Sequence, residues 1–396
     1  MRFFKDLSPS AFTAGFVAVL VGFTSSVAIV FQAAQAFNAT PAQIASWMWA
    51  LGIGMGLCTV LPSLYFKKPV MVAWSTPGAA VLATAGVAGG FSMAEAVGAF
   101  MVCAALITLC GVTGWFEKLM NRIPVAIASA LLAGVLARFG MSGFTAAQTA
   151  LPLVLLMLAM YLVGRRFMPR YAVVFTLLAG IAYAALHGEL AWSTVSFTFT
   201  LPVFVMPQFT MAASISLAIP LFVVTMASQN LPGVAAIRAT GYEGQIPVSK
   251  VITLTGLATL VLAPFGAFAL NLSAITAAIV MGKEAHTDPE KRYTAAVSCG
   301  LIYLVIGVFG AAVTSLLAAF PKELVATIAG LALLGTIGAG LAAAVKDESH
   351  REAALITFLV TLSGVVIAGI GSAFWGVVAG ALALFVQQYR QRQPQD

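Results

Sequence analysis

The stretch "MVAWSTPGAAVL", residues 71–82, is apolar enough for a membrane helix but carries the signals of a broken one. Pro69 precedes a short β-prone run, and Ser75 and Thr76 stand directly before a Pro-Gly pair. A Ser or Thr followed by Pro is typical of a helix N-cap with Pro in the first turn. We therefore predict an extended piece up to Trp74 and a half-helix that begins at Ser75. A simple kink in a packed helix is the alternative.

The same break recurs in the second half of the chain. "STPGAAVL" (75–82) aligns with "SAITAAIV" (273–280), and "GVTG" (111–114) aligns with "GVFG" (307–310) at nearly the same shift. "APFGAFALN" (263–271) would supply the second extended piece, and Asn271 or Ser273 could cap the half-helix that follows. This agreement indicates two repeats of seven segments. An odd number of spans per repeat forces opposite orientations, which is the plan of many secondary transporters.

The composition indicates an all-α polytopic membrane protein. The chain has 396 residues, of which 61% are hydrophobic and 8% charged, whereas soluble domains carry about 25% charged residues. Segments 70–88 and 266–281 are shorter than the ~20 residues of a straight span, as the broken helices require. The fourteen predicted spans are 12–36, 42–64, 70–88, 93–115, 123–140, 146–164, 171–187, 210–230, 248–263, 266–281, 293–319, 323–344, 353–370 and 373–389.

The basic residues give the predicted orientation. If the chain starts inside, every Lys and Arg except Arg138 and Lys322 falls on the cytoplasmic side, as in most membrane proteins. Both termini are then cytoplasmic. The first repeat is 1–187, the periplasmic connection 188–209 and the second repeat 210–396. The net charge of +7 is spread in ones and twos between spans, so we expect no nucleic-acid partner.

Two half-helix N-termini near the membrane midplane would form an anion site. Each end offers unpaired N–H groups and about half a positive charge. We expect the two breaks to supply substrate-binding residues, together with the polar clusters of the first and eighth spans. Serine hydroxyls can also bond their own helix or join helices, so the roles of the serines in the first span stay open. The candidate residues are Trp74, Ser75, Thr76, Gly78, Phe268, Leu270, Asn271, Ser273, Ser25, Ser26, Gln32, Ser228, Gln229 and Asn230.

Several kinds of chemistry are not indicated. No Asp or Glu lies in the middle of a predicted span, so a proton relay through a buried acid is not visible. The four cysteines form no CxxC pair, and no spacing of His, Cys, Asp or Glu suggests a catalytic set. We expect no enzyme, metal or cofactor. Arg138 either snorkels to the outer interface or attracts anions at a gate.

Five motifs together resemble the BenE family, described as benzoate/proton symporters of bacterial inner membranes. The likeness covers essentially the whole chain. It implies the fold of uracil/xanthine permeases and sulfate-type anion transporters, with a core domain (12–115 and 210–320), a gate domain (122–187 and 322–390), elevator-type movement and a homodimer. The motifs are "GFVAVLVGFTSSVAIVFQAA" (15–34), "WSTPGAA" (74–80), "TMASQNLPGVAAI" (225–237), "FGAFALNLSAITAAI" (265–279) and "GSAFWGVVAG" (371–380).

The chain departs from the nucleobase branch of that fold. Those permeases carry acidic residues in spans eight and ten, where this chain has Ser228, Gln229 and Asn271. An amide or hydroxyl can donate to an anion, whereas a carboxylate would repel it. The departure therefore favours an anionic substrate. Together with the resemblance, which implies benzoate and proton symport, it leads us to expect secondary transport of an organic anion, benzoate or a similar aromatic carboxylate, with proton symport. The alternatives are uniport without a proton, another solute such as an inorganic anion or a nucleobase, and, least favoured, a membrane-embedded enzyme or sensor.

Overall fold

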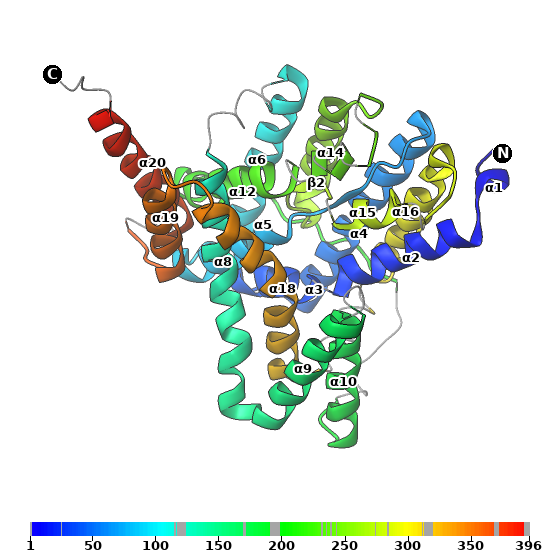
Figure 1. The fold of residues 1–396 in the computed structure, drawn as a ribbon, viewed down its shortest axis with the longest axis horizontal. Helices are drawn as coiled ribbons and strands as arrows, with labels where there is room; N and C mark the ends of the chain where they lie inside the picture. Colours follow the sequence, from blue (N-terminus) through cyan, green and yellow to red (C-terminus); the bar gives the residue numbers. More distant parts are fainter. Residues whose placement is uncertain are drawn as a thin grey trace.

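The structure is a computed structural model, and it is mostly helical (Figure 1). Six of the described helices are long and apolar enough to cross a membrane, and shorter apolar helices accompany them. The described residues are 2–391 without 25, 115, 117–123, 169–171, 191–198, 231, 232, 235, 238, 239, 243, 274, 283, 284, 311, 313–319 and 368–371.

Three helices of the first half begin at side-chain caps, which Thr40, Ser75 and Ser92 provide. The side-chain hydroxyl of Thr40 accepts the N–H of Gln43, and Ser92 and Glu95 form the same reciprocal capping box. The elements are α1 (Arg2–Asp6), α2 (Pro9–Thr24), α3 (Val27–Ala36), α4 (Pro41–Phe66), β1 (Val72–Trp74), α5 (Thr76–Gly89), α6 (Met93–Thr113), α8 (Val125–Thr145), α9 (Ala147–Phe167) and α10 (Ala172–Leu186).

The second half contains shorter and more irregular pieces. Its elements are α11 (Met211–Ala213), the π-helix η3 (Ser214–Ala218), α12 (Ile219–Thr225), the π-helix η4 (Met226–Asn230), α14 (Val248–Leu262), the 3₁₀ turn η5 (Ala263–Phe265), β2 (Leu270–Leu272), α15 (Ile275–Val280), the 3₁₀ turn η6 (Pro289–Lys291), α16 (Tyr293–Val308), α18 (Lys322–Val345), α19 (Arg351–Ser363) and α20 (Ser372–Gln391).

Two predicted spans are less regular than expected. The segment 12–36 is not one helix, because α2 ends at Thr24 and α3 begins at Val27, with Ser26 at φ −141° between them. The Ser26 hydroxyl donates to the Gly22 carbonyl at 2.8 Å, which gives that backbone group a partner at the break. The eighth segment, 210–230, contains two π-helical turns. Turns of this type are frequent at functional sites.

Helices from the two halves pack against each other through small residues. α4 packs on α16, α6 on α14, and α8 on α18. A Cβ added to Gly52 of α4 would lie 2.5 Å from the Cα of Gly307 in α16. A Cβ at Gly256 of α14 would lie 2.7 Å from the backbone nitrogen of Thr108 in α6. Such backbone approach is how membrane helices associate without a hydrophobic driving force.

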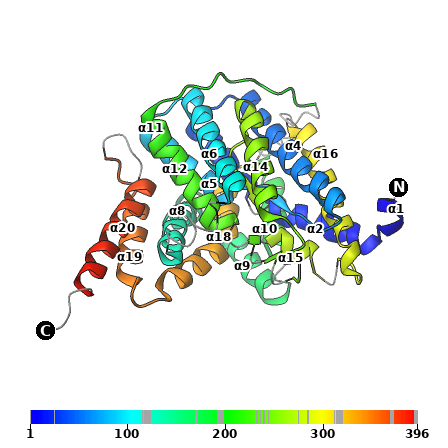
Figure 2. The ribbon, with the colours of Figure 1, turned by 90° about the horizontal axis from the view of Figure 1, so that it is seen from above.

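Residues 199–209 form an extended segment, the strap, that crosses the ends of these helices (Figure 2). The N–H of Val203 donates to Ser46 Oγ of α4 at 2.9 Å, and the N–H of Val205 donates to the Pro264 carbonyl at 2.8 Å. The N–H of Gln208 donates to the Ala94 carbonyl of α6 at 2.9 Å. The strap is the C-terminal part of the predicted connection 188–209, and its amides bond to α4, to the turn η5 after α14 and to α6.

The remaining helices form a second group. α9, α10 and α18 share one buried cluster that includes Leu153, Met157 and Leu324, and α8 packs with α19 and α20. In Figure 1 the group formed by α8, α9, α10 and α18 projects below the layer that contains β2. α19 and α20 lie beside that layer, on the left of the view. The termini lie at opposite ends of the molecule.

Candidate functional site

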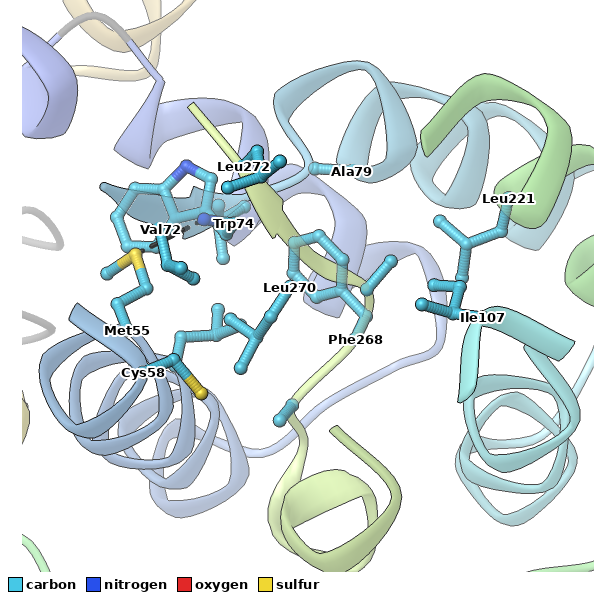
Figure 3. Packing of buried hydrophobic residues seen from close by; sticks show 14 of the residues in the cluster. Met55, Cys58, Val72, Trp74, Ala79, Ile107, Leu221, Phe268, Leu270 and Leu272 are labelled. Carbon is cyan, nitrogen blue, oxygen red and sulfur yellow. Dashed lines mark hydrogen bonds between the residues drawn. The ribbon is translucent and has the colours of Figure 1, made fainter. Parts of the chain in front are cut away.

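The two predicted breaks meet as a two-stranded antiparallel ribbon. Val72 pairs with Leu272, Ala73 with Asn271, and Trp74 with Leu270. The N–H of Ser75 continues the ladder to the Ala269 carbonyl at 2.9 Å. Both segments therefore contain an extended piece followed by a helix, which confirms the prediction from residues 71–82 and 263–271. The ribbon and its buried neighbours are drawn in Figure 3.

Hydroxyl side chains complete the hydrogen bonds of the ribbon. Thr59 Oγ1 of α4 accepts the N–H of Val72 at 3.2 Å, and Thr259 Oγ1 of α14 accepts the N–H of Leu270 at 3.1 Å. A buried strand edge needs such partners because water is absent. Each strand is thus supported by the helix that precedes it in the sequence.

Ser75 is the best-defined polar group at the start of α5. Its Oγ accepts the N–H of Gly78 at 3.1 Å and the hydroxyl of Thr225, in α12, at 2.9 Å. A serine oxygen has two lone pairs, and the hydroxyl hydrogen of Ser75 has no acceptor among the described residues, so it can donate to a third group. The residue is fully buried. The predicted N-cap is therefore confirmed, and it presents a donor at the positive end of a 14-residue helix.

Close packing around the first turn of α5 explains why a glycine, Gly78, follows Pro77. A Cβ at Gly78 would lie 2.5 Å from Leu221 Cδ1 of α12 and 2.7 Å from Ser75 Oγ. Glycine there lets α12 approach the beginning of α5, which in turn allows Thr225 to reach Ser75. The side chain of Thr76 is half-buried.

The second half-helix differs from the first. α15 has 6 residues, and Ser273 Oγ accepts the hydroxyl of Thr276 at 2.6 Å. Asn271 lies inside β2 and its Nδ2 donates to the Leu272 carbonyl at 2.9 Å, so it does not cap α15. Its buried Oδ1 has no hydrogen-bond partner among the described residues. The expectation that Asn271 could cap this helix is wrong, because the residue belongs to the strand.

The polar cluster of the eighth segment divides into two parts. Asn230 is fully buried, and its Oδ1 accepts the N–H of Leu272 at 2.9 Å. It therefore holds β2 in place. Ser228 and Gln229 are half-buried on the π-helix η4, and η4 packs against α8 and β2. These two side chains lie where the group of helices around the ribbon meets the group around α8.

Trp74 connects the first segment to the ribbon. Its Nε1–H donates to Ser26 Oγ at 2.9 Å, and Ser26 Oγ–H donates to the Gly22 carbonyl at 2.8 Å. The rings of Phe23 and Trp74 lie 5.6 Å apart. Ser26 therefore belongs to the same group of residues as the ribbon. Ser25 lies outside the described residues, and Gln32 is half-buried on α3, which packs on α5.

Two candidate residues lie in tightly packed surroundings. Phe268 is fully buried, with ring centroids 5.8 Å from Trp47 and 6.2 Å from Phe100. Leu270 is also buried, and its Cδ1 would lie 2.6 Å from a Cβ added to Gly54 of α4. Figure 3 shows Phe268 among the core side chains between β2 and α6. A role of these side chains in substrate binding stays a prediction.

The charges lie away from the ribbon. None of the described Asp and Glu residues is buried, and Arg292 is the buried charged side chain among the described residues. Its Nη1 donates to the Met281 carbonyl beyond the end of α15 at 2.8 Å. A Cβ at Gly364, which follows α19, would lie 1.8 Å from Arg138 Nη1. Arg138 thus lies at the negative end of a helix, and its role in snorkelling or at a gate stays a prediction.

Sequence reasoning gave no role to Thr225, Thr59 or Thr259. All three are hydroxyl residues within apolar helices, and all are fully buried. A hydroxyl residue within an apolar helix is the sequence signal that could have identified them. The signal is weak because threonines commonly bond a carbonyl of their own helix. The partner of each one is fixed by the tertiary fold.

Broken helices paired inside a bundle of apolar helices are a feature of many secondary transporters. Two solved structures share this fold. The transmembrane domain of the cyanobacterial bicarbonate transporter BicA superposes with a TM-score of 0.56 at 16% identity, over 96% of this chain and 97% of that one. SLC26A9 superposes with a TM-score of 0.62 at 10% identity, over 97% of this chain and 66% of that one.

The sequence then identifies the family. The chain belongs to the BenE family, whose model, described as benzoate membrane transport protein, matches residues 5–386. Inner membrane protein YdcO of Escherichia coli (strain K12) is 47% identical over 98% of this chain and 97% of its own length. The benzoate membrane transport protein of Acinetobacter baylyi (strain ATCC 33305 / BD413 / ADP1) is 40% identical over 96% of both chains. The resemblance expected from the motifs is confirmed.

Proposed function

We propose that this protein carries benzoate or a similar aromatic carboxylate across the bacterial inner membrane as a secondary transporter. The observation that carries the proposal is the available hydroxyl of Ser75 at the N-terminus of α5. The neighbouring residue Trp74 packs its ring 5.6 Å from that of Phe23, which supplies aromatic surface near this end of the helix. A pocket with an apolar body and a few fixed polar donors suits an aromatic acid. The name of the Acinetobacter relative supports this substrate class.

The carboxylate would be held by donors that carry no full charge. The first turn of α5 contributes its partial positive charge, and Ser75 contributes its hydroxyl hydrogen. Ser228 and Gln229 lie next to β2 on η4 and would complete the site from the side of α8. This donor set accepts an anion without a buried Lys or Arg. It would also release the anion readily, as a transport cycle requires.

The architecture that we propose around this site has fourteen segments in two inverted repeats. The packing of α4 on α16 and of α6 on α14 supports it, because these pairs exchange when the two halves are interchanged. The core domain would comprise 12–115 and 210–320, and the gate domain 122–187 and 322–390. Both termini would face the cytoplasm. Two copies would form the dimer implied by the family resemblance.

Uptake of labelled benzoate into proteoliposomes tests this function directly. We expect saturable uptake that increases when the outside is made more acidic than the inside, since the proposal includes proton symport. Saturable uptake that ignores the pH gradient would leave a uniporter and refute proton coupling. No saturable uptake under either condition would remove benzoate as a substrate.

Asp substitutions test where the anion lies. Ser228→Asp, Gln229→Asp and Asn271→Asp each place a carboxylate at the proposed site, and like-charge repulsion in a low dielectric should weaken anion binding by tenfold or more. Ser228 and Gln229 are half-buried, so these two variants should still accumulate in the membrane. Unchanged affinity in all three would place the site elsewhere.

An inorganic anion is the second candidate substrate. It is favoured by the fact that a helix N-terminus binds an anion without reading an aromatic ring. Competition decides between the two: excess bicarbonate or sulfate should leave benzoate binding unchanged if the ring is recognised. Displacement of benzoate by these ions at similar concentrations would favour the inorganic anion. Displacement by uracil would favour a nucleobase.

A further inference from the structure

A groove lies away from the ribbon, between the Phe66 end of α4 and the beginning of α14. Its volume is about 350 Å³. Its lining residues are apolar except for the Lys250 ammonium group and the Tyr65 hydroxyl. The residues that form it include Leu61, Pro62, Tyr65 and Phe66 from α4, and Lys250 and Leu254 from α14.

The groove continues as an apolar track along the outer faces of the same two helices. Leu57 and Leu64 on α4, and Leu257 and Val261 on α14, are all exposed large hydrophobic side chains. From Lys250 to Val261 the helical rise spans about 16 Å. One leaflet of a bilayer has a hydrocarbon layer of about 15 Å. The track therefore matches the length of one acyl chain.

Positive charge is concentrated at one end of the track. Lys250 lies in the first turn of α14, where the helix dipole is itself positive and no side chain caps the free N–H groups. Lys67 follows Phe66 directly, and both lysines are exposed. The Lys250 ammonium group and the positive end of the α14 dipole would both attract a bound anion.

We propose that this groove binds an anionic glycerophospholipid. The phosphate contacts Lys250 and the first N–H groups of α14, and an acyl chain lies along Leu61, Leu254 and Leu257. In the orientation proposed above, the lipid comes from the cytoplasmic leaflet. The site is separate from the substrate site, and its test does not depend on transport.

Lipid titration of the purified full-length protein in neutral detergent tests this proposal. The apparent Kd is taken from the rise of Tm with lipid concentration. Dioleoylphosphatidylglycerol should raise Tm, and Lys250→Gln should weaken its binding about fivefold, as one basic residue near an anionic surface is worth ~1 kcal/mol. Lys346→Gln, which removes an exposed lysine elsewhere, should leave the Kd within about twofold of the unchanged protein.

Further arms separate the possible ligands. Dioleoylphosphatidylcholine at the same concentrations should bind several-fold more weakly, and inorganic phosphate should give no rise of Tm. An equal rise with phosphatidylcholine, or with inorganic phosphate, would overturn the proposal. Leu254→Trp, which fills the groove, should remove the preference for phosphatidylglycerol. Retention of that preference in Leu254→Trp, or in Lys250→Gln, would also overturn it.

Discussion

Removal of the Ser75 hydroxyl gives the sharpest test of the proposed site. Ser75→Ala deletes the N-cap of α5, the acceptor of the Thr225 hydroxyl and the proposed donor to the substrate. Thr225→Val is the matched control, because it removes the same interhelical hydrogen bond but leaves the Ser75 hydroxyl in place. The two variants separate substrate binding from stability.

The structure sets the size of each effect. Loss of an N-cap costs ~1 kcal/mol, and the buried Thr225 hydroxyl left without an acceptor costs a further ~1–3 kcal/mol. Ser75→Ala should therefore lower the free energy of unfolding by about 2–4 kcal/mol. Thr225→Val loses one hydrogen bond without leaving an unpaired group, which is worth about 1 kcal/mol. The double variant should be less destabilised than the sum of the two single variants.

Substrate affinity should respond differently from stability. A hydrogen bond to a charged group contributes ~1.5–3 kcal/mol, so Ser75→Ala should raise the Kd for benzoate roughly tenfold to hundredfold. Thr225→Val should change it by less than about threefold, since the donor to the carboxylate remains.

Affinity is measured by isothermal titration of the purified protein, and stability by denaturant titration in micelles. The reasoning is refuted if Ser75→Ala binds benzoate as tightly as the unchanged protein. It is equally refuted if Thr225→Val weakens binding as much as Ser75→Ala does, because the effect would then come from the contact between α5 and α12.

Four further substitutions, one of them with a matched control, probe the supports of the site. Trp74→Phe and Ser26→Ala remove the same hydrogen bond, so the double variant should lose less stability than the sum of the two single variants; additive losses by denaturant titration would contradict this. Ser26→Ala also leaves the Trp74 indole N–H unpaired and should lower stability by about 1–3 kcal/mol. Asn230→Leu leaves a buried N–H of β2 unpaired and should destabilise by about 1–3 kcal/mol, measured in the same way, whereas an unchanged midpoint would show that Asn230 does not hold the strand. Gly266→Ala should fail to accumulate in the membrane, because φ is +104° and the new Cβ would lie 1.9 Å from an indole carbon of Trp47. Gly338→Ala in α18 is the control, since its Cβ has open space, and it should accumulate normally on immunoblots. Equal amounts of the two proteins would count against the backbone described here.

The breaks themselves could be predicted because their signals are local. Proline, glycine and a capping hydroxyl at residues 75–78 act on their own turn of backbone, so the extended piece and the helix start follow from the sequence. The pairing of β1 with β2 was not predicted. It joins residues about two hundred positions apart, and nothing within either segment specifies its register.

The contacts of the site depended on the tertiary fold and were harder to anticipate. Asn271 was expected near the cap of α15, but the strand extends through it, and only the pairing with Ala73 shows this. No proline or glycine beside Ser26 indicates the break in the helix there. The Ser26 hydroxyl accepts a hydrogen bond from the Trp74 indole, a tertiary contact that the local sequence does not indicate. The small polar residues were therefore predicted to continue the helix.

The strap through Val203, Val205 and Gln208 has a mechanical consequence. Its amides are bonded to α4, to the turn after α14 and to α6, which come from both halves of the chain. These helices cannot slide past one another without breaking those bonds, so the strap behaves as a brace across the top of the bundle. Opening and closing of the protein would then occur at the seam where α8 and α18 touch α5, η4 and α3, with the braced helices travelling as a single block.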